Sequence, residues 1–226
     1  MKELCYLKLM KELINSYFKD YSLIREISDR CLNTERWRGN VLLMVIDAAF
    51  TSVGLNYFQV VVPKVKKFEE DFVKTEKIVC LSDFVNFNLE ELFYIWKNKR
   101  SWQIVKEISK YLSNISKNDK EALRVWARNS SLSNWRENTI GRIKGVGLVT
   151  YQYLRMMGGI DTIMPDKIVK RTMNEILQKV GKKDLNNDIE FINFIEKIAK
   201  KTGYRAVELC FMTWFRNNPE KIKDMP

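Results

Sequence analysis

The chain of 226 residues carries a formal net charge of +11 and contains no histidine. The lack of histidine excludes a Ser-His-Asp triad, a Cys-His dyad and histidine-ligated zinc. The excess of Lys and Arg favours a polyanionic partner, nucleic acid ahead of a membrane surface, with a merely lysine-rich composition as the alternative. No apolar run reaches the roughly 18 residues that indicate a membrane span, so no membrane partner is expected.

Apolar residues recur at spacings of three and four along most of the chain, which predicts helices. The first predicted helix, at 4–19, begins a segment that is amphipathic and unlike a signal peptide, so a cytoplasmic protein is expected. A short strand-like run, Val60–Val62, lies within helical phases. The sequence predicts an all-α fold with helices at 4–19, 37–50, 54–68, 89–97, 101–113, 119–128, 134–143, 147–157, 166–179, 187–202 and 203–216.

Several short signals mark helix starts. Asn88 and Asn134 are each followed by Glu at the third position, which is typical of an N-cap. Pro165 ends one segment, and Asp166 is placed to cap the next. The four cysteines are scattered without a C-x-x-C pair, which predicts buried free thiols in a reducing compartment: Cys5, Cys31, Cys80 and Cys210.

Residues 134–157 are predicted to form two helices joined by a tight turn over 144–147, with the sequence KGVG. Glycine permits the positive φ or close backbone approach that such a turn needs. The first N–H groups of the second helix lack intrahelical partners, so the turn is suited to hold a phosphate. Arg142 and Lys144 add positive charge beside it. An ordinary glycine cap between two helices is the alternative.

The stretch GVGLVTYQYL, followed by PDKIVKR, resembles the helix-hairpin-helix DNA glycosylase superfamily, closest to the 3-methyladenine glycosylase and endonuclease III-like fold. NLEELFYIWKNKRSWQIVKEISKYL resembles paired helices of that family, and WRGNVLLMVIDAAFTSVGLNYF resembles its gap-filling helix. The resemblance implies a two-lobed all-α fold with the active-site cleft between the lobes. A helical barrel, 38–160, would end in the helix-hairpin-helix of 134–157. Residues 1–37 plus 161–226 would form the second lobe.

The resemblance also implies a DNA base-excision repair enzyme that hydrolyses the N-glycosidic bond of a flipped damaged or mismatched base. Asp166 would be the catalytic carboxylate, because the sugar gains positive charge as the base leaves. Bifunctional members carry a lysine where this chain has Val149, and valine cannot attack the sugar. A monofunctional glycosylase is therefore expected. The alternatives are a lyase that uses a displaced Lys144 or Lys167, a non-catalytic DNA-binding hairpin, and a helical scaffold protein.

The expected partner is double-stranded DNA, bound by a monomer associated with the nucleoid. The expected DNA-backbone contacts are Arg142, Lys144, Gly145, Val146, Gly147 and Lys167, with a solvated charge as the alternative for the two lysines. Candidates for the base pocket or wedge are Asp47, Phe50, Thr51, Ser52, Trp126 and Tyr151, with Trp135 and Tyr153 as further aromatics. For each aromatic the alternative is a core position. Asp47 lies in an apolar run and needs a partner or a purpose, so it binds a base edge or pairs structurally.

The resemblance implies no catalytic cofactor. It implies a monovalent cation, K⁺ or Na⁺, held by the backbone carbonyls of Gly141, Ile143 and Val146. The iron–sulfur cluster of the endonuclease III branch needs four closely spaced cysteines near the C-terminus. Only Cys210 lies there, so no cluster is expected.

Overall fold

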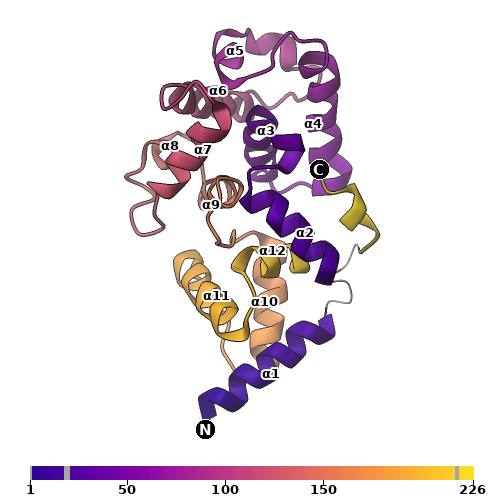
Figure 1. Cartoon of the computed structure of the whole chain (residues 1–226), viewed down its shortest axis with the longest axis vertical. Coiled ribbons are helices and arrows are strands. Elements are labelled where there is room, and N and C mark those ends of the chain that lie inside the picture. Colours follow the sequence, from indigo (N-terminus) through magenta and orange to yellow (C-terminus); the bar gives the residue numbers. More distant parts are fainter. Residues whose placement is uncertain (1, 18–20, 217–218) are drawn as a thin grey trace. The chain divides into compact units, whose positions relative to one another are not determined.

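The structure, a computed structural model, describes residues 2–17, 21–216 and 219–226. All regular elements in these ranges are helical, so the fold class is all-α (Figure 1). None of the helices described is both long and apolar enough to cross a membrane. The chain divides into two compact units, one of Cys31–Ile160 with Pro226, the other of Met1–Arg30 with Asp161–Met225. The second unit thus combines an N-terminal segment with residues 161–225.

The unit Cys31–Ile160 is built around α3 (Val41–Thr51), which is buried from Val41 to Phe50. An apolar surface on all sides suits a central helix, and α3 packs against α4, α6, α7 and α9. The other elements of this unit are η1 (Arg36–Gly39), η2 (Tyr57–Val61), α4 (Val62–Phe68), η3 (Glu69–Val73), α5 (Leu81–Asn86), η4 (Leu89–Leu92), α6 (Lys99–Ser113), α7 (Asp119–Arg128), α8 (Thr139–Arg142) and α9 (Leu148–Met157).

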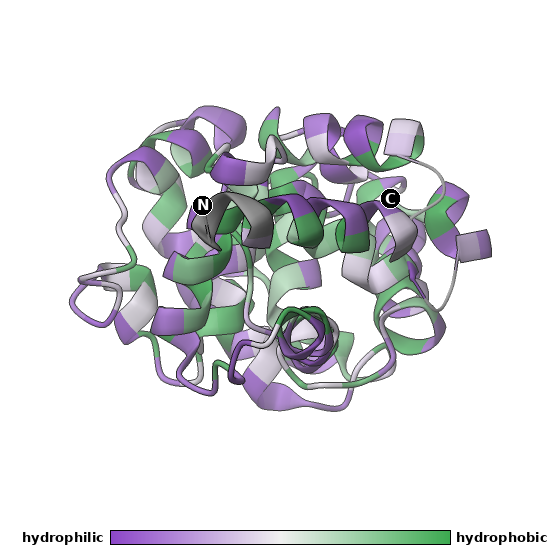
Figure 2. Cartoon of the chain, turned by 90° about the horizontal axis from the view of Figure 1, so that it is seen from below, coloured by the Kyte–Doolittle hydropathy of each residue, from purple (hydrophilic) through white to green (hydrophobic). Residues whose placement is uncertain are grey.

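The second unit contains α1 (Lys2–Tyr17) and most of α2 (Tyr21–Leu32), followed by α10 (Lys167–Lys179), α11 (Asp188–Thr202), α12 (Ala206–Phe215) and η5 (Pro219–Asp224). Its central helix is α12, which is buried along its whole length and packs against α10 and α11. Hydrophobic and hydrophilic residues alternate along most helical ribbons (Figure 2), as expected where one face of a helix is buried.

Asparagine begins many of these helices. Its side-chain oxygen accepts a backbone N–H of the first turn, which satisfies a donor that has no intrahelical partner. This geometry occurs at Asn40, Asn56, Asn88, Asn98, Asn118, Asn138 and Asn187. The predicted cap at Asn88 is confirmed, although it begins a single 3₁₀ turn and not a helix over 89–97.

The predicted helix at 134–143 is wrong in its first half. The cap is Asn138, whose side chain accepts the Ile140 N–H at 3.1 Å, and α8 spans only Thr139–Arg142. The Asn134 side chain instead accepts the Ser131 hydroxyl. The polar side chains before Asn138 therefore form local hydrogen bonds within turns, and these bonds compete with a helical conformation.

Other predictions also need correction. The helices α2 and α5 were not predicted. The segment with Val60–Val62 is helical, as predicted, although it is a π-helical turn that leads into α4 and not one continuous α-helix. Cys31 and Cys210 are buried and form no disulfide among the described residues, and burial raises the pKa of Cys31 to about 12. The prediction of a buried thiol is wrong for Cys80, which is half-buried at the N-cap of α5, with its Sγ 3.0 Å from the Ser82 hydroxyl oxygen. The side chain of Cys5 lies outside the part that the structure describes.

Candidate functional site

Asp166 is the N-cap of α10, as the sequence predicts. Its Oδ1 accepts the Val169 N–H at 2.8 Å, after an extended backbone at Asp166 itself. Its Oδ2 accepts the indole N–H of Trp214, from α12, at 2.7 Å. Because each oxygen has a donor from a different helix, the orientation of the carboxylate is fixed.

The electrostatic setting of Asp166 is unusual for a carboxylate. Burial raises its pKa above the ordinary value of 3.8, and the hydrogen bonds from Val169, Trp214 and the Ile168 N–H act in the opposite direction. No lysine or arginine forms a salt bridge with it among the residues that the structure describes. A carboxylate that is held but has no cation can stabilise positive charge that develops on a ligand.

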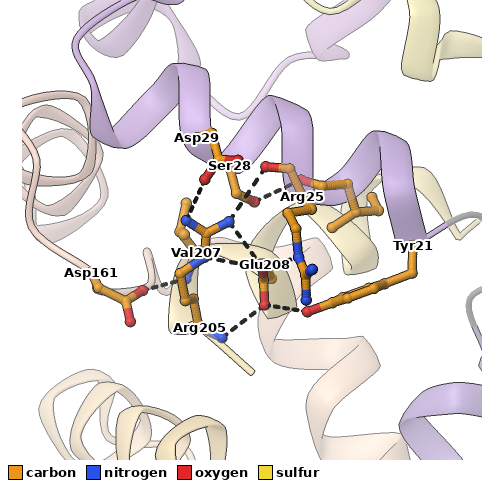
Figure 3. A network of polar contacts seen from close by, with 9 residues as sticks. Tyr21, Arg25, Ser28, Asp29, Asp161, Arg205, Val207 and Glu208 are labelled. Atoms are coloured by element: carbon orange, nitrogen blue, oxygen red, sulfur yellow. Dashed lines mark hydrogen bonds and ion pairs between the residues drawn. The ribbon is translucent and has the colours of Figure 1, made fainter. Parts of the chain in front are cut away.

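A second aspartate of the same unit, Asp161, also accepts a helix N–H, but it is exposed, whereas Asp166 is half-buried (Figure 3). Its Oδ1 accepts the Val207 N–H at 3.0 Å at the start of α12, and burial raises its pKa. Beside it, the Arg205 guanidinium binds Glu208 of α12 and donates to Asp29 of α2 at 2.6 Å. These contacts tie the start of α12 to α2 and have a structural role.

The turn between α8 and α9 has two different glycines. Gly145 has φ +103°, and a Cβ there would lie 2.5 Å from the Arg100 Nε, so this position requires glycine. Gly147 has φ −101°, and a Cβ there would meet no atom within 4 Å. Gly147 is the N-cap of α9 and offers no side chain to its first N–H groups. The start of α9 is therefore open to an approaching group.

Positive side chains surround this turn. Arg142 and Lys144 are exposed, Val146 is buried beneath the turn, and Arg100 at the start of α6 lies against Gly145. Sequence reasoning missed Arg100 as a neighbour of the turn, although the basic run KNKR at the start of α6 was a visible signal. Lys167 is also exposed, next to Asp166 in the other unit.

The turn also contains the carbonyls predicted to hold a monovalent cation. The Ile143 carbonyl accepts the Val146 N–H at 2.9 Å, while no backbone N–H of the described residues donates to the carbonyls of Gly141 or Val146. Two carbonyls thus retain their acceptor capacity, which fits such an ion. Gly141 itself is tightly packed, since a Cβ there would lie 1.7 Å from the Trp135 carbonyl oxygen. No group of three or more Cys, Asp or Glu in the described ranges could hold a metal ion.

Asp47 takes the structural alternative. It is completely buried and has an ion pair with Arg36, with 3.1 Å between the guanidinium and Oδ2. All its other donors also belong to the unit Cys31–Ile160, so the carboxylate is not available to a base edge. These donors are the indole of Trp37 at 2.8 Å, the hydroxyls of Tyr57 and Tyr153 at 3.0 Å each, and the Thr51 hydroxyl at 3.2 Å.

The aromatic candidates for the base pocket occupy core positions. Phe50 stacks on Trp96 with 4.5 Å between ring centroids. Trp126 is buried and donates to the Asn138 side chain at 3.0 Å, and buried Tyr151 donates to the Ser131 carbonyl at 3.1 Å. These contacts give all three candidates a packing role. Trp135 is half-buried and has the Arg136 guanidinium over its ring.

The loop that follows α3 exposes two apolar side chains that sequence reasoning missed. Val53 is 41% exposed and Leu55 is 48% exposed. The predicted wedge residues Thr51 and Ser52 precede them and are half-buried, and the Ser52 hydroxyl donates to the Ala49 carbonyl at 2.8 Å. The signal was the apolar pair around Gly54, but its exposure depends on the tertiary fold.

No protein-family model matches this chain, and no similar curated protein or solved structure was found. The site must therefore be interpreted from its own residues.

Proposed function

We propose that the chain is a monofunctional DNA N-glycosylase of the helix-hairpin-helix superfamily, which hydrolyses the N-glycosidic bond of a flipped damaged or mismatched base. The observation that supports this most is Asp166, an oriented carboxylate that has no salt-bridge partner in the described part of the chain, in a protein of net charge +11. The two-lobed arrangement, with a helical barrel of 38–160 and Asp166 in the second lobe, is part of the same proposal.

The chemistry needs a carboxylate that stays free to act on the sugar. The C1′–N bond breaks with its electron pair on the departing base, and positive charge develops at C1′ and the ring oxygen. The Asp166 carboxylate stabilises this charge and accepts a proton from the water whose oxygen bonds to C1′. The Val169 and Trp214 N–H groups keep the carboxylate oriented during this step.

The turn between α8 and α9 would bind the DNA backbone. The open space at Gly147 lets a phosphate oxygen approach the first N–H groups of α9, where the helix dipole favours an anion. Arg142, Lys144 and Lys167 add charge without reading the base sequence. A K⁺ or Na⁺ ion on the carbonyls of Gly141, Ile143 and Val146 would supply further positive charge facing that phosphate.

The loop 52–56 would fill the space that a flipped base leaves. Apolar side chains that enter a base stack stabilise an unstacked or kinked duplex. Val53 and Leu55 are exposed and apolar, so they suit this role better than Thr51 and Ser52.

A panel of duplexes tests the reaction. Each duplex would hold one lesion: uracil, hypoxanthine, 8-oxoguanine, ethenoadenine, 3-methyladenine or a G·T mismatch. Strand cleavage that appears only after alkali identifies a monofunctional glycosylase and its base. Cleavage without alkali means that Lys144, Lys167 or another lysine attacks the sugar. Salt-dependent DNA binding without base release supports a non-catalytic DNA-binding hairpin, and no DNA binding supports a scaffold protein.

A further inference from the structure

We infer that Asp47 is a positioning residue that fixes the exposed loop 52–56 in register with the hairpin helix α9. The consequence for DNA rests on the proposed function, whereas the positioning itself concerns only the unit Cys31–Ile160.

The loop is attached to Asp47 at both of its ends. Thr51, directly before the loop, donates its hydroxyl to Oδ1 at 3.2 Å. Tyr57, directly after the loop, donates its hydroxyl to Oδ2 at 3.0 Å. Burial raises the pKa of the Tyr57 hydroxyl, so it stays protonated and remains a donor. One carboxylate therefore closes a loop whose apolar tips, Val53 and Leu55, point to solvent.

The same carboxylate is attached to the hairpin. Tyr153 lies in α9, six residues after Gly147, and its buried hydroxyl donates to Oδ2 at 3.0 Å. Because α9 is a short regular helix packed against α3, the position of Tyr153 is fixed relative to the turn. The Asp47 carboxylate thus holds both the loop 52–56 and the helix that follows the turn between α8 and α9.

The charge of Asp47 is balanced locally. The fully buried Arg36 pairs with Oδ2 at 3.1 Å and also donates to the Tyr57 hydroxyl at 2.7 Å. Trp37 donates its indole N–H to the same oxygen at 2.8 Å. Hydrogen bonds in a buried network are stronger and more directional than those in water. This explains why an acidic residue occupies a helix that packing alone would fill with an aliphatic residue.

The fixed position of the loop matters because ordering a mobile loop on binding costs conformational entropy, which lowers the affinity of the protein for DNA. With both ends held, Val53 and Leu55 can enter a gap in the base stack without first ordering the loop. We call the hydrogen bonds from Thr51 and Tyr57 to Asp47 the clamp. The clamp should therefore strengthen binding to a duplex that lacks a base. It should not affect binding to an intact duplex, where phosphate contacts dominate.

The test uses two variants that each delete one hydroxyl of the clamp, Tyr57→Phe and Thr51→Val. The matched control, Tyr151→Phe, deletes a buried hydroxyl of α9 that donates to the Ser131 carbonyl. Amide hydrogen exchange would be measured along the full chain. We expect exchange at 53–56 to rise about tenfold or more in each clamp variant, with no such local rise in the control. An equal rise in all three variants, or none at 53–56, overturns the inference.

Binding to DNA gives the second readout. The affinities of wild type and variants would be measured for an intact duplex and for the same duplex with one stable abasic site. We expect wild type to prefer the abasic duplex, and the clamp variants to lose most of that preference at unchanged affinity for the intact duplex. A full preference retained by Tyr57→Phe overturns the positioning role. Faster exchange at 53–56, with no DNA preference in wild type, would support the clamp and contradict the proposed function.

Discussion

Asp47 and Asp166 show how one residue type takes two roles in the two units of the molecule. Asp47 has the Arg36 guanidinium and four further donors, so its charge is fully compensated. Asp166 accepts N–H groups from Val169, Ile168 and Trp214, and within the described ranges no lysine or arginine lies at salt-bridge distance from it. A compensated carboxylate builds structure, whereas an oriented and uncompensated one can act on a ligand.

The largest loss of stability is expected when the ion pair between Asp47 and Arg36 is broken. Asp47→Ala leaves the buried Arg36 without its partner, and breaking a buried ion pair in this way costs about 3–5 kcal/mol. Urea denaturation of the variant and of wild type measures this loss in the free energy of unfolding. A loss below about 1 kcal/mol would mean that the Asp47 network is not a structural centre.

A smaller loss of stability is expected at Asp166. Asp166→Ala removes both acceptors and the N-cap of α10 and should cost about 1–2 kcal/mol. Asp166→Asn keeps an oxygen for the Val169 N–H but turns its NH2 group toward the Trp214 indole N–H, so it should cost about 1 kcal/mol. The same denaturation experiment measures both variants. If Asp166→Asn were as damaging as Asp47→Ala, the distinction between the two carboxylates would fail.

From the exposed lysine in the turn between α8 and α9 we expect a change of several-fold in how strongly DNA affinity depends on salt. Lys144→Ala would remove one of the proposed phosphate contacts, so the slope of log affinity against log salt should become shallower by about 1. Fluorescence anisotropy with a labelled duplex at several salt concentrations gives the slope. Lys183→Ala removes an equally exposed lysine between α10 and α11 and should leave the slope unchanged. Equal slopes for both variants would remove the turn from the DNA interface.

The smallest effect is a pH dependence of stability. Burial raises the pKa of Asp166 in the folded state above 3.8, so between the unfolded and folded pKa values the folded state binds more protons. The contribution of Asp166 to stability is therefore full below the unfolded pKa and is lost as the pH rises through the folded pKa. Asp166→Asn does not titrate. Its unfolding free energy, measured against that of wild type, should thus improve from pH 3.5 to pH 7, and a constant difference would contradict the raised pKa.

Local signals let the sequence predict Asp166 and the turn. The Pro-Asp pair predicts that a helix begins with Asp166 as its N-cap, and the structure confirms that cap. The glycines mark the turn before α9, although only Gly145 needs the positive φ. The first helix of the hairpin was overestimated, because Asn134 and Asn138 are both suitable caps and sequence periodicity does not choose between them.

The sequence does not predict hydrogen-bond partners that are far apart along the chain. The apolar run around Asp47 shows that this residue needs a partner, but the Tyr153 hydroxyl is 106 positions away along the chain. Trp214 is likewise 48 positions from Asp166. The exposure of Val53 and Leu55 depends on how the loop leaves α3, which residue types alone do not determine.

The most direct test of the central claim is single-turnover base release by Asp166→Asn, on the lesion that wild type excises. Asp161→Asn is the control, because Asp161 lies in the same unit and also accepts a helix N–H, although it is exposed where Asp166 is half-buried. The account predicts that Asp166→Asn loses about 10²–10⁴-fold in rate, while Asp161→Asn stays near wild type. Unchanged release by Asp166→Asn would contradict the assignment of Asp166 as the catalytic carboxylate.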